Sequence, residues 1–400
     1  MFGIRHIKLS FFIDFLFKEK SFPGFYNKVF SKISDGVLLN NETVFKKNTS
    51  KKVYSISDIP DYFSLETSEE LSKLRTLRAP LYNGFYIDLG KYCDLNDYMN
   101  NKLGRARKSQ LKRYRKRLDL CLTPIYKVYF GGIQKNEYDY IFDSLKNITI
   151  RRFEQKEETN FELSYLDKYH EMMFPLIHQK KACIFVIYDK QKPVNISLNF
   201  IEGQLLLHWN SCFDIDYYMF NLGHINMVNH LQWCFDHGIK IFDMGRGDFL
   251  HKRKYITDSY IYQEHITYHS KSTVITLFAH YRVLVLKLRF TLIKILKKIN
   301  AQVLYSRYAK VKYQIRNYKN TKKTQKDIVV ETVISNLPDS IHLKAVDIDE
   351  IAPALIQPLN DFLYNHKEPV NNIKVYQDNS YDKTLYLVGK RKMIKLDLSI

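Results

Sequence analysis

The chain has 400 residues, of which 45% are apolar and 26% are charged, with 30 Tyr and 26 Phe. This composition excludes a disordered chain, and the length indicates two domains, or two fused halves with an appendage. Sixty-two Lys and Arg against 42 Asp and Glu give a formal net charge of +20, so we expect anionic partners. The net charge alone does not identify whether such a partner is a nucleotide, a phospholipid, a nucleic acid or an acidic glycan.

Cysteine usage and the N-terminal stretch both indicate a cytoplasmic protein. The apolar run at residues 10–17 is interrupted by Asp14 and has no small-residue cleavage site after it, so we expect no signal peptide. The five cysteines are widely spaced, form no Cys-x-x-Cys pair and suggest neither disulfides nor a zinc site. They are Cys93, Cys121, Cys183, Cys212 and Cys234.

Residues 1–146 are interpreted as an N-terminal half. Residues 84–89 read as a strand closed by Gly90, residues 126–130 as a second strand, and residues 138–146 as a helix. Between them, residues 102–118 form a helical stretch without an acidic residue. This basic helix is either a solvated surface face or a ligand-binding face. Its basic side chains include Arg105, Arg107, Lys108, Lys112, Arg113, Arg115, Lys116 and Arg117.

Residues 147–272 are interpreted as a C-terminal half with a mixed sheet. A helix at 162–179 precedes three apolar runs, which are separated by short polar turns typical of an antiparallel meander. A helix at 223–236 and a strand at 240–244 follow, and a strand, helix and strand in this order require parallel pairing. A last strand at 260–268 completes an α+β fold. The three apolar runs are 182–188, 194–201 and 204–211.

Residues 273–326 are expected to form a basic helix and linker. The helix at 273–299 is rich in Leu, Ile and Val, but Lys and Arg interrupt every 18-residue window, so it is not expected to span a membrane. Its basic residues only partly share one stripe, which favours packing on the core over peripheral contact with a membrane surface.

Residues 327–400 are expected to form a small separate module, for which the sequence suggests no role. It contains an acidic helix candidate at 346–364 and an alternating strand at 385–398.

The first part of the candidate site is the start of the helix at 223–236. Backbone N–H groups at a helix start, with Gly223 permitting close approach, form an anion site suited to a pyrophosphate. Asn221, Leu222 and His224 flank this glycine and complete the candidate cofactor-binding loop. The alternative is that Gly223 is only a turn residue.

The second part is the strand end Asp243-Met244-Gly245-Arg246-Gly247-Asp248, in which two glycines bracket an arginine. In an acyl-transfer site, exposed N–H donors or Arg246 could stabilise an oxyanion, while a carboxylate such as Asp243 accepts the proton of an amine. Lys252, a few residues on, could meet a phosphate or carboxylate. The alternative is an ion pair between Asp243 and Arg246 that fixes the turn.

These motifs resemble a known family. Residues 242–252, F-D-M-G-R-G-D-F-L-H-K, are similar to the F-D-x-G-R-G-x-x-x-Y-K pattern of the CelD-like branch of the acyl-CoA N-acyltransferase (GNAT) superfamily, associated with cellulose and exopolysaccharide biosynthesis. Residues 217–224 resemble its aromatic segment ending in Ser-Pro-Gly, and residues 107–118 its arginine-rich helix. The chain departs from the pattern at Asn221, Leu222 and His251.

The resemblance covers about residues 75–270 and implies tandem GNAT-like halves, as in the Fem aminoacyltransferases. It also implies a thioester donor, acetyl-CoA or another acyl-CoA, and an amine or hydroxyl acceptor. By position it carries Gly223 into the cofactor loop, and Asp243, Arg246, Gly247 and Lys252 into the reactive strand end.

Three functions remain open. The first is an acyl-CoA-dependent N- or O-acyltransferase acting on a sugar, polysaccharide or cell-envelope precursor. The second is a Fem-like aminoacyltransferase whose basic helix contacts aminoacyl-tRNA. The third is a non-catalytic binding protein whose helix at 273–299 lies on an anionic membrane. The absence of Gly-x-Ser-x-Gly and His-Glu-x-x-His motifs argues against common hydrolase and zinc chemistries.

Overall fold

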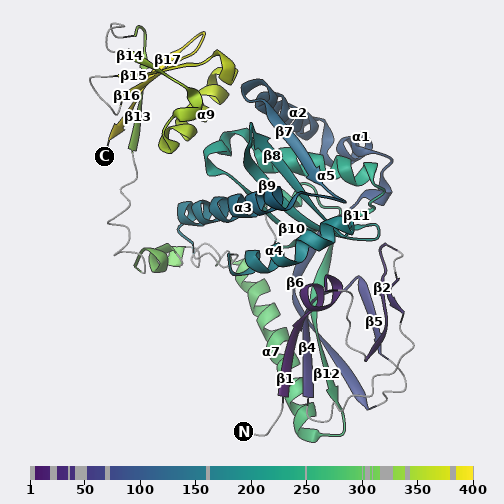
Figure 1. Cartoon of the computed structure of the whole chain (residues 1–400). Helices are drawn as coiled ribbons and strands as arrows, with labels where there is room; N and C mark the ends of the chain where they lie inside the picture. Colours follow the sequence, from purple (N-terminus) through teal and green to yellow (C-terminus); the bar gives the residue numbers. More distant parts are fainter. Residues whose placement is uncertain are drawn as a thin grey trace.

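The computed structural model is an α+β protein built around one long mixed sheet (Figure 1). It describes residues 5–18, 25–34, 37–40, 52–67, 73–158, 163–247, 250–299, 301, 307–308, 310–315, 328–337, 343–378 and 384–399. The α+β class predicted from the sequence, with mixed sheets flanked by helices, is confirmed.

The main sheet has nine strands in the order β1-β4-β12-β6-β11-β10-β9-β8-β7. β10 and β11 run parallel, as predicted, and β8, β9 and β10 form the predicted antiparallel meander. β11 pairs antiparallel with β6, which joins the first 88 residues to the later part of the chain in a single sheet. The strands are β1 (Arg5–Ser10), β4 (Lys52–Pro60), β12 (Asp258–His269), β6 (Leu74–Asp88), β11 (Ile241–Arg246), β10 (Leu205–Phe213), β9 (Lys192–Glu202), β8 (Ala182–Asp189) and β7 (Pro124–Tyr129).

Helices cover both faces of the β7–β11 end of this sheet. Alternate side chains of β8 face opposite sides: Ile184 and Val186 pack towards α3 and α4, whereas Cys183 and Phe185 pack towards α2 and α5. Because both faces are covered, β8 and β9 are buried over almost their whole length. The helices are α1 (Leu95–Tyr98), α2 (Gly104–Cys121), α3 (Lys135–Lys156), α4 (Leu163–His178), α5 (Leu222–Asp236) and α6 (Leu250–Arg253).

The predicted division at residue 146 falls inside α3, and β7, which precedes it, pairs with β8, which follows it. The division of the chain into halves at that point stays a prediction.

A small three-stranded sheet lies beside the N-terminal strands, and α7 packs on β6 and β12. Their bounds are β2 (Tyr26–Ser31), β3 (Val37–Asn40), β5 (Phe63–Thr67) and α7 (Thr273–Lys298).

The C-terminal module is a five-stranded antiparallel sheet with one helix, and two sequence expectations about it were wrong. The helix begins only at Ile356, because Pro353 disfavours helical backbone at the residue before it. The predicted strand at 385–398 is a hairpin, whose turn is closed by a Gly389 N–H to Lys392 carbonyl bond. The elements are β13 (Ile328–Ile334), β14 (Leu343–Val346), α9 (Ile356–His366), β15 (Lys374–Asp378), β16 (Thr384–Val388) and β17 (Met393–Ser399).

The module shares a hydrophobic core with α2 and the start of α5, so it is packed onto the main fold. Leu359, Phe362 and Leu363 of α9 are buried in the same cluster as Leu118 and Leu222. Most of the predicted linker at 309–326 lies outside the described residues.

Candidate functional site

The candidate cofactor loop begins α5 at the carboxyl end of the parallel β10–β11 pair. Asn221 adopts a left-handed backbone with φ 57° and its side chain does not cap the helix. The first N–H groups of a helix have no acceptor inside it, and of these two residues Gly223 is exposed, so its N–H is available to an anion, whereas Leu222 is 1% exposed. A Cβ at Gly223 would meet no atom within 4 Å, so there is open space beside this turn. The Leu222 side chain is a core residue.

His224 is held between two tyrosines and an arginine. Its ring stacks on that of Tyr114, and the Tyr255 hydroxyl lies 3.0 Å from its Nδ1. An Nη2 atom of Arg107, on the basic helix α2, lies 3.2 Å from the same nitrogen. Arg107 Nε is buried and has no hydrogen-bond partner among the described residues, which leaves part of this guanidinium unsatisfied. The sequence signal for Arg107 was the resemblance of α2 to an arginine-rich family helix.

A pocket of about 610 Å³ opens beside this cluster. Three basic side chains line it, Arg107, Arg113 and Lys254, and none of its lining residues is acidic. The other lining residues are Leu103, Ala106 and Gln110. The donor set therefore suits a ligand with several negative charges, such as the phosphates of a nucleotide.

Asp243, at the end of β11, is a buried carboxylate surrounded by donors. It is 1% exposed, and it accepts hydrogen bonds from the hydroxyls of Tyr62 (2.6 Å) and Tyr260 (2.7 and 2.8 Å) and from the Gly245 N–H (2.6 Å). Burial raises the pKa of Asp243, although these donors oppose the shift. Burial also keeps the pKa values of Tyr62 and Tyr260 well above their usual range, so both phenols stay protonated and donate.

The strand end beyond Asp243 turns outward. Gly245 and Gly247 have φ values of 68° and 99°, which few other residues adopt. The Arg246 side chain is exposed, and its guanidinium lies 5.7 Å from the centre of the Tyr82 ring. Within the described structure no ion pair joins Asp243 to Arg246, so the turn is fixed by hydroxyl and amide donors. Asp248 lies outside the described residues.

Lys252 and Tyr255 bring the two parts of the site together. Lys252 Nζ donates to the carbonyl oxygens of Met244 (2.6 Å) and Arg246 (2.9 Å), at the strand end. Three residues later, Tyr255 contacts His224 in the cofactor loop. Burial lowers the pKa of Lys252 to about 8. The loop and the strand end thus lie on either side of one short segment.

The N-terminal strands supply residues that the sequence did not single out. Tyr62 follows β4, and on the same strand Asp58 has a left-handed backbone, with φ 65°, and accepts hydrogen bonds from Tyr82 and Ser57. Gly84 on β6 makes room for Tyr260, because a Cβ there would lie 2.2 Å from the tyrosine ring. No local spacing could reveal these contacts, since Tyr62 and Asp243 are 181 positions apart.

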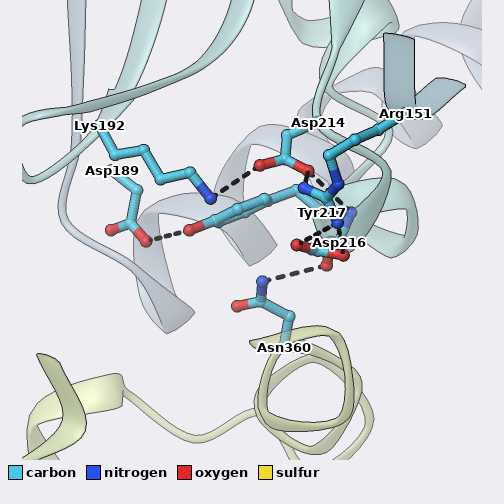
Figure 2. Close-up of polar contacts among 7 residues, drawn as sticks. All are labelled: Arg151, Asp189, Lys192, Asp214, Asp216, Tyr217 and Asn360. Atoms are coloured by element: carbon cyan, nitrogen blue, oxygen red, sulfur yellow. Dashed lines mark hydrogen bonds and ion pairs between the residues drawn. The ribbon is translucent and has the colours of Figure 1, made fainter. Parts of the chain in front are cut away.

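A polar network fixes the turn before the cofactor loop, η5 (Ile215–Phe220) (Figure 2). Arg151 of α3 donates to Asp214 (2.9 Å) and to both oxygens of Asp216 (2.8 and 2.9 Å). Lys192 of β9 forms an ion pair of 2.8 Å with Asp214. Asp214 is 1% exposed and Asp216 is 5% exposed, so two buried carboxylates are balanced by two cations.

The C-terminal module joins the same network through α9. Figure 2 shows Asn360 pointing from α9 to the backbone of the turn, where its Nδ2 donates to the Asp216 carbonyl at 3.0 Å. The Phe220 and Tyr364 rings lie 5.5 Å apart, edge to face. The C-terminal module therefore supports the turn that leads into Asn221.

The described residues contain no cluster of three or more His, Cys, Asp or Glu that could hold a metal ion. His208 of β10 is hydrogen-bonded to Asn199 through Nδ1 (2.9 Å) and lies against Phe242. Its packing is that of a structural residue.

Comparison with known proteins gives one family match. Residues 105–253 match the model of an acetyltransferase (GNAT) domain. No curated protein matches the chain.

The solved structures to which the chain is similar at low identity include the following three. L-PGS from Bacillus licheniformis has 12% identity and a TM-score of 0.35, covering 58% of this chain and 72% of its own. FemX has 11% identity and a TM-score of 0.39, and the match covers 57% of this chain and 75% of FemX. A tandem GNAT protein from the clavulanic acid biosynthesis pathway has 6% identity and a TM-score of 0.31, and the match covers 55% of this chain and 65% of that protein.

Proposed function

We propose that this chain, which carries a GNAT domain over residues 105–253, is an acyltransferase that takes its acyl group from acetyl-CoA or another acyl-CoA. One observation carries the proposal: Lys252 and Tyr255 join the anion-binding start of α5 to the reactive strand end of β11. An acyl-CoA supplies an acyl group already activated as a thioester. The protein then has to bind the donor and the acceptor, orient them, and stabilise the charge that develops during transfer.

The donor's phosphates would be held by the α5 N-terminus and the basic pocket. The N–H of Gly223 offers a hydrogen bond, and the start of α5 offers the positive end of the helix dipole. Arg107, Arg113 and Lys254 add charge beside them. The open space at Gly223 fits this use, because a ligand can approach the backbone closely there.

The strand end would orient the acyl carbonyl and the acceptor. Asp243 is enclosed by three donors, so its part is to hold the turn that exposes Gly245, Arg246 and Gly247. In this proposal the backbone N–H of Gly247 and the Arg246 guanidinium stabilise negative charge on oxygen. Lys252 fixes the carbonyls of that turn, and its cationic form adds positive charge.

The acceptor we propose is an amine or hydroxyl of a sugar, polysaccharide or cell-envelope precursor. This part rests on the resemblance of residues 242–252 to the CelD-like pattern.

Calorimetric titration of the full chain with acetyl-CoA and longer acyl-CoAs tests the donor. The wild type should bind, and Arg113→Gln should weaken binding about tenfold, because a charge-assisted hydrogen bond is lost. Lys112→Gln is the matched control, since Lys112 is exposed on the same helix but does not line the pocket. Absence of acyl-CoA binding, or equal effects of the two variants, would refute the donor site.

A second candidate is transfer from aminoacyl-tRNA, and the surface of α2 favours it. Four of its basic residues are exposed, namely Arg105, Lys112, Arg113 and Lys116. Of its other basic residues, Arg107 lines the pocket and Arg115 pairs with Asp119. If tRNA binds, affinity should fall steeply with salt, because several phosphates are neutralised together. A weak salt dependence would favour the acyl-CoA donor.

A further inference from the structure

Helix α7 has two apolar faces, of which the described residues cover only one. Its inner face packs on the sheet through Ile275, Ala279, Val283 and Leu286. The opposite face is a stripe of large apolar side chains at spacings of three and four residues, and each is more than half exposed. We call this the α7 stripe: Leu277 (73%), Tyr281 (65%), Leu284 (55%), Leu288 (61%), Leu292 (56%), Ile295 (51%) and Ile299 (67%).

This arrangement revises the sequence expectation that the helix mainly packs on the core. Core packing holds for one face of its first half, and residues 291–299 are all exposed. The position of α7 agrees with this, since it lies beside β12 and β6, towards the β1–β4 end of the sheet and away from the β7–β8 end (Figure 1). A contiguous exposed apolar surface of this kind marks an interaction site.

The charges of α7 identify what can cover the stripe. Residues 273–299 contain six Lys and Arg and no Asp or Glu. At about 100° per residue, Lys287, Lys294 and Lys298 lie along one edge of the stripe, and Arg282 and Arg289 along the other. Arg282 and Arg289, which do not share a helix face with the three lysines, therefore lie on the other side of the α7 stripe. Arg282 is in part engaged, by Glu264 at 3.2 Å.

We propose that α7 docks in the plane of an anionic lipid surface, with the α7 stripe in the boundary between headgroups and acyl chains. Lys287, Lys294 and Lys298 on one edge and Arg289 on the other would reach the phosphates while their stems lie along the apolar layer, and Arg282 stays bound to Glu264. A second copy of α7 is a poorer occupant, because two helices without acidic residues would oppose like charges along both edges. No helix in the described part of the chain is long and apolar enough to cross a membrane, which fits an interfacial position.

Co-sedimentation of the full chain with vesicles tests the apolar part. Binding is expected to vesicles that contain phosphatidylglycerol, and Leu284→Ser/Leu288→Ser should weaken it at least tenfold. The matched control is Ile125→Ser/Tyr165→Ser, which removes two similarly exposed side chains (54% and 48%) outside α7. Thermal unfolding should be alike in all three proteins. Equal loss in both double variants would overturn the assignment of the stripe.

A charge variant tests the lipid class. Lys287→Gln/Lys294→Gln/Lys298→Gln should lose at least tenfold in affinity for phosphatidylglycerol vesicles, and salt should have the same effect. Equal binding to vesicles of phosphatidylcholine alone, or no vesicle binding together with concentration-dependent dimers in solution, would refute the proposal. The inference goes beyond the acyltransferase function, and titration with acetyl-CoA keeps the two apart, because the stripe variants should bind it as the wild type does.

Discussion

The Tyr62 hydroxyl donates a hydrogen bond of 2.6 Å to the Asp243 carboxylate, so the segment after β4 lies against the end of β11, within the residues that match a GNAT domain. The N-terminal strands are therefore part of the site's support. Both groups are almost fully buried, and a buried acceptor that loses a donor has no water to replace it.

Tyr62→Phe should lower the free energy of unfolding by about 1–3 kcal/mol, because Asp243 keeps its burial but loses one donor. Urea denaturation measures the change. Tyr165→Phe serves as the control, since this tyrosine is 48% exposed and its hydroxyl reaches water. If the two substitutions cost the same, Asp243 does not depend on Tyr62.

Gly223→Val should weaken acyl-CoA binding at least tenfold while changing the free energy of unfolding by less than about 1 kcal/mol. A Cβ at this position would meet no protein atom within 4 Å in the described structure, so we expect the substitution to obstruct only a ligand at the backbone. Gly132→Val is the counterpart, because Gly132 has the same open surroundings away from the loop. Unchanged acyl-CoA affinity in Gly223→Val would remove this turn from the donor site.

Asn360→Leu should raise the dissociation constant for acyl-CoA several-fold, because the buried Asp216 carbonyl loses its donor and the turn before Asn221 is less well held. Hydrogen exchange of residues 215–224 should become faster in the variant. Asn371→Leu changes an exposed residue of the same module and should alter neither property. Loss of stability with unchanged exchange and affinity would mean that the module does not act on the loop.

Acid should destabilise the protein through His230. Burial lowers the pKa of His230 to about 4, whereas the unfolded chain takes up this proton near 6.5. Between these values the unfolded state binds more protons, so stability is full above about pH 6.5 and falls as the pH drops towards 4, by up to about 3 kcal/mol. His265, with a pKa lowered to about 3 by burial, adds to the effect.

His230→Leu should flatten this part of the pH profile. Urea unfolding of both proteins between pH 7 and 4.5 provides the comparison, and the difference between pH 7 and 4.5 should be smaller in the variant. Identical slopes would show that His230 is not kept neutral by the fold. The exposed His237 offers a control, since His237→Leu should leave the slope unchanged.

The order of elements from β6 to β12 could be predicted from the sequence, because each signal is local. Apolar runs ending at Glu202-Gly203 predict a hairpin, and a glycine after residue 236 ends a helix whatever packs on it. The glycines around Arg246 likewise mark a turn through their own backbone preferences, and both have positive φ.

The predictions of a long acidic helix and of a single strand in the C-terminal module were wrong because each missed a local interruption. Pro353 and the turn after Gly389 interrupt patterns that periodicity alone treats as continuous. Composition over a window does not show where a chain reverses.

The sequence by itself determined the parallel β10–β11 pair, the helix start at Gly223 and the turn around Arg246, since these depend on residues close together in the chain. Only the tertiary structure decided that Tyr62 donates to Asp243, that Arg107 lies on His224 and that Asn360 donates to the turn before Asn221. It also decided that the described residues leave one apolar face of α7 exposed. Contacts between distant segments depend on how sheets and helices pack, and a periodic pattern shows which faces are apolar without showing which of them another element covers.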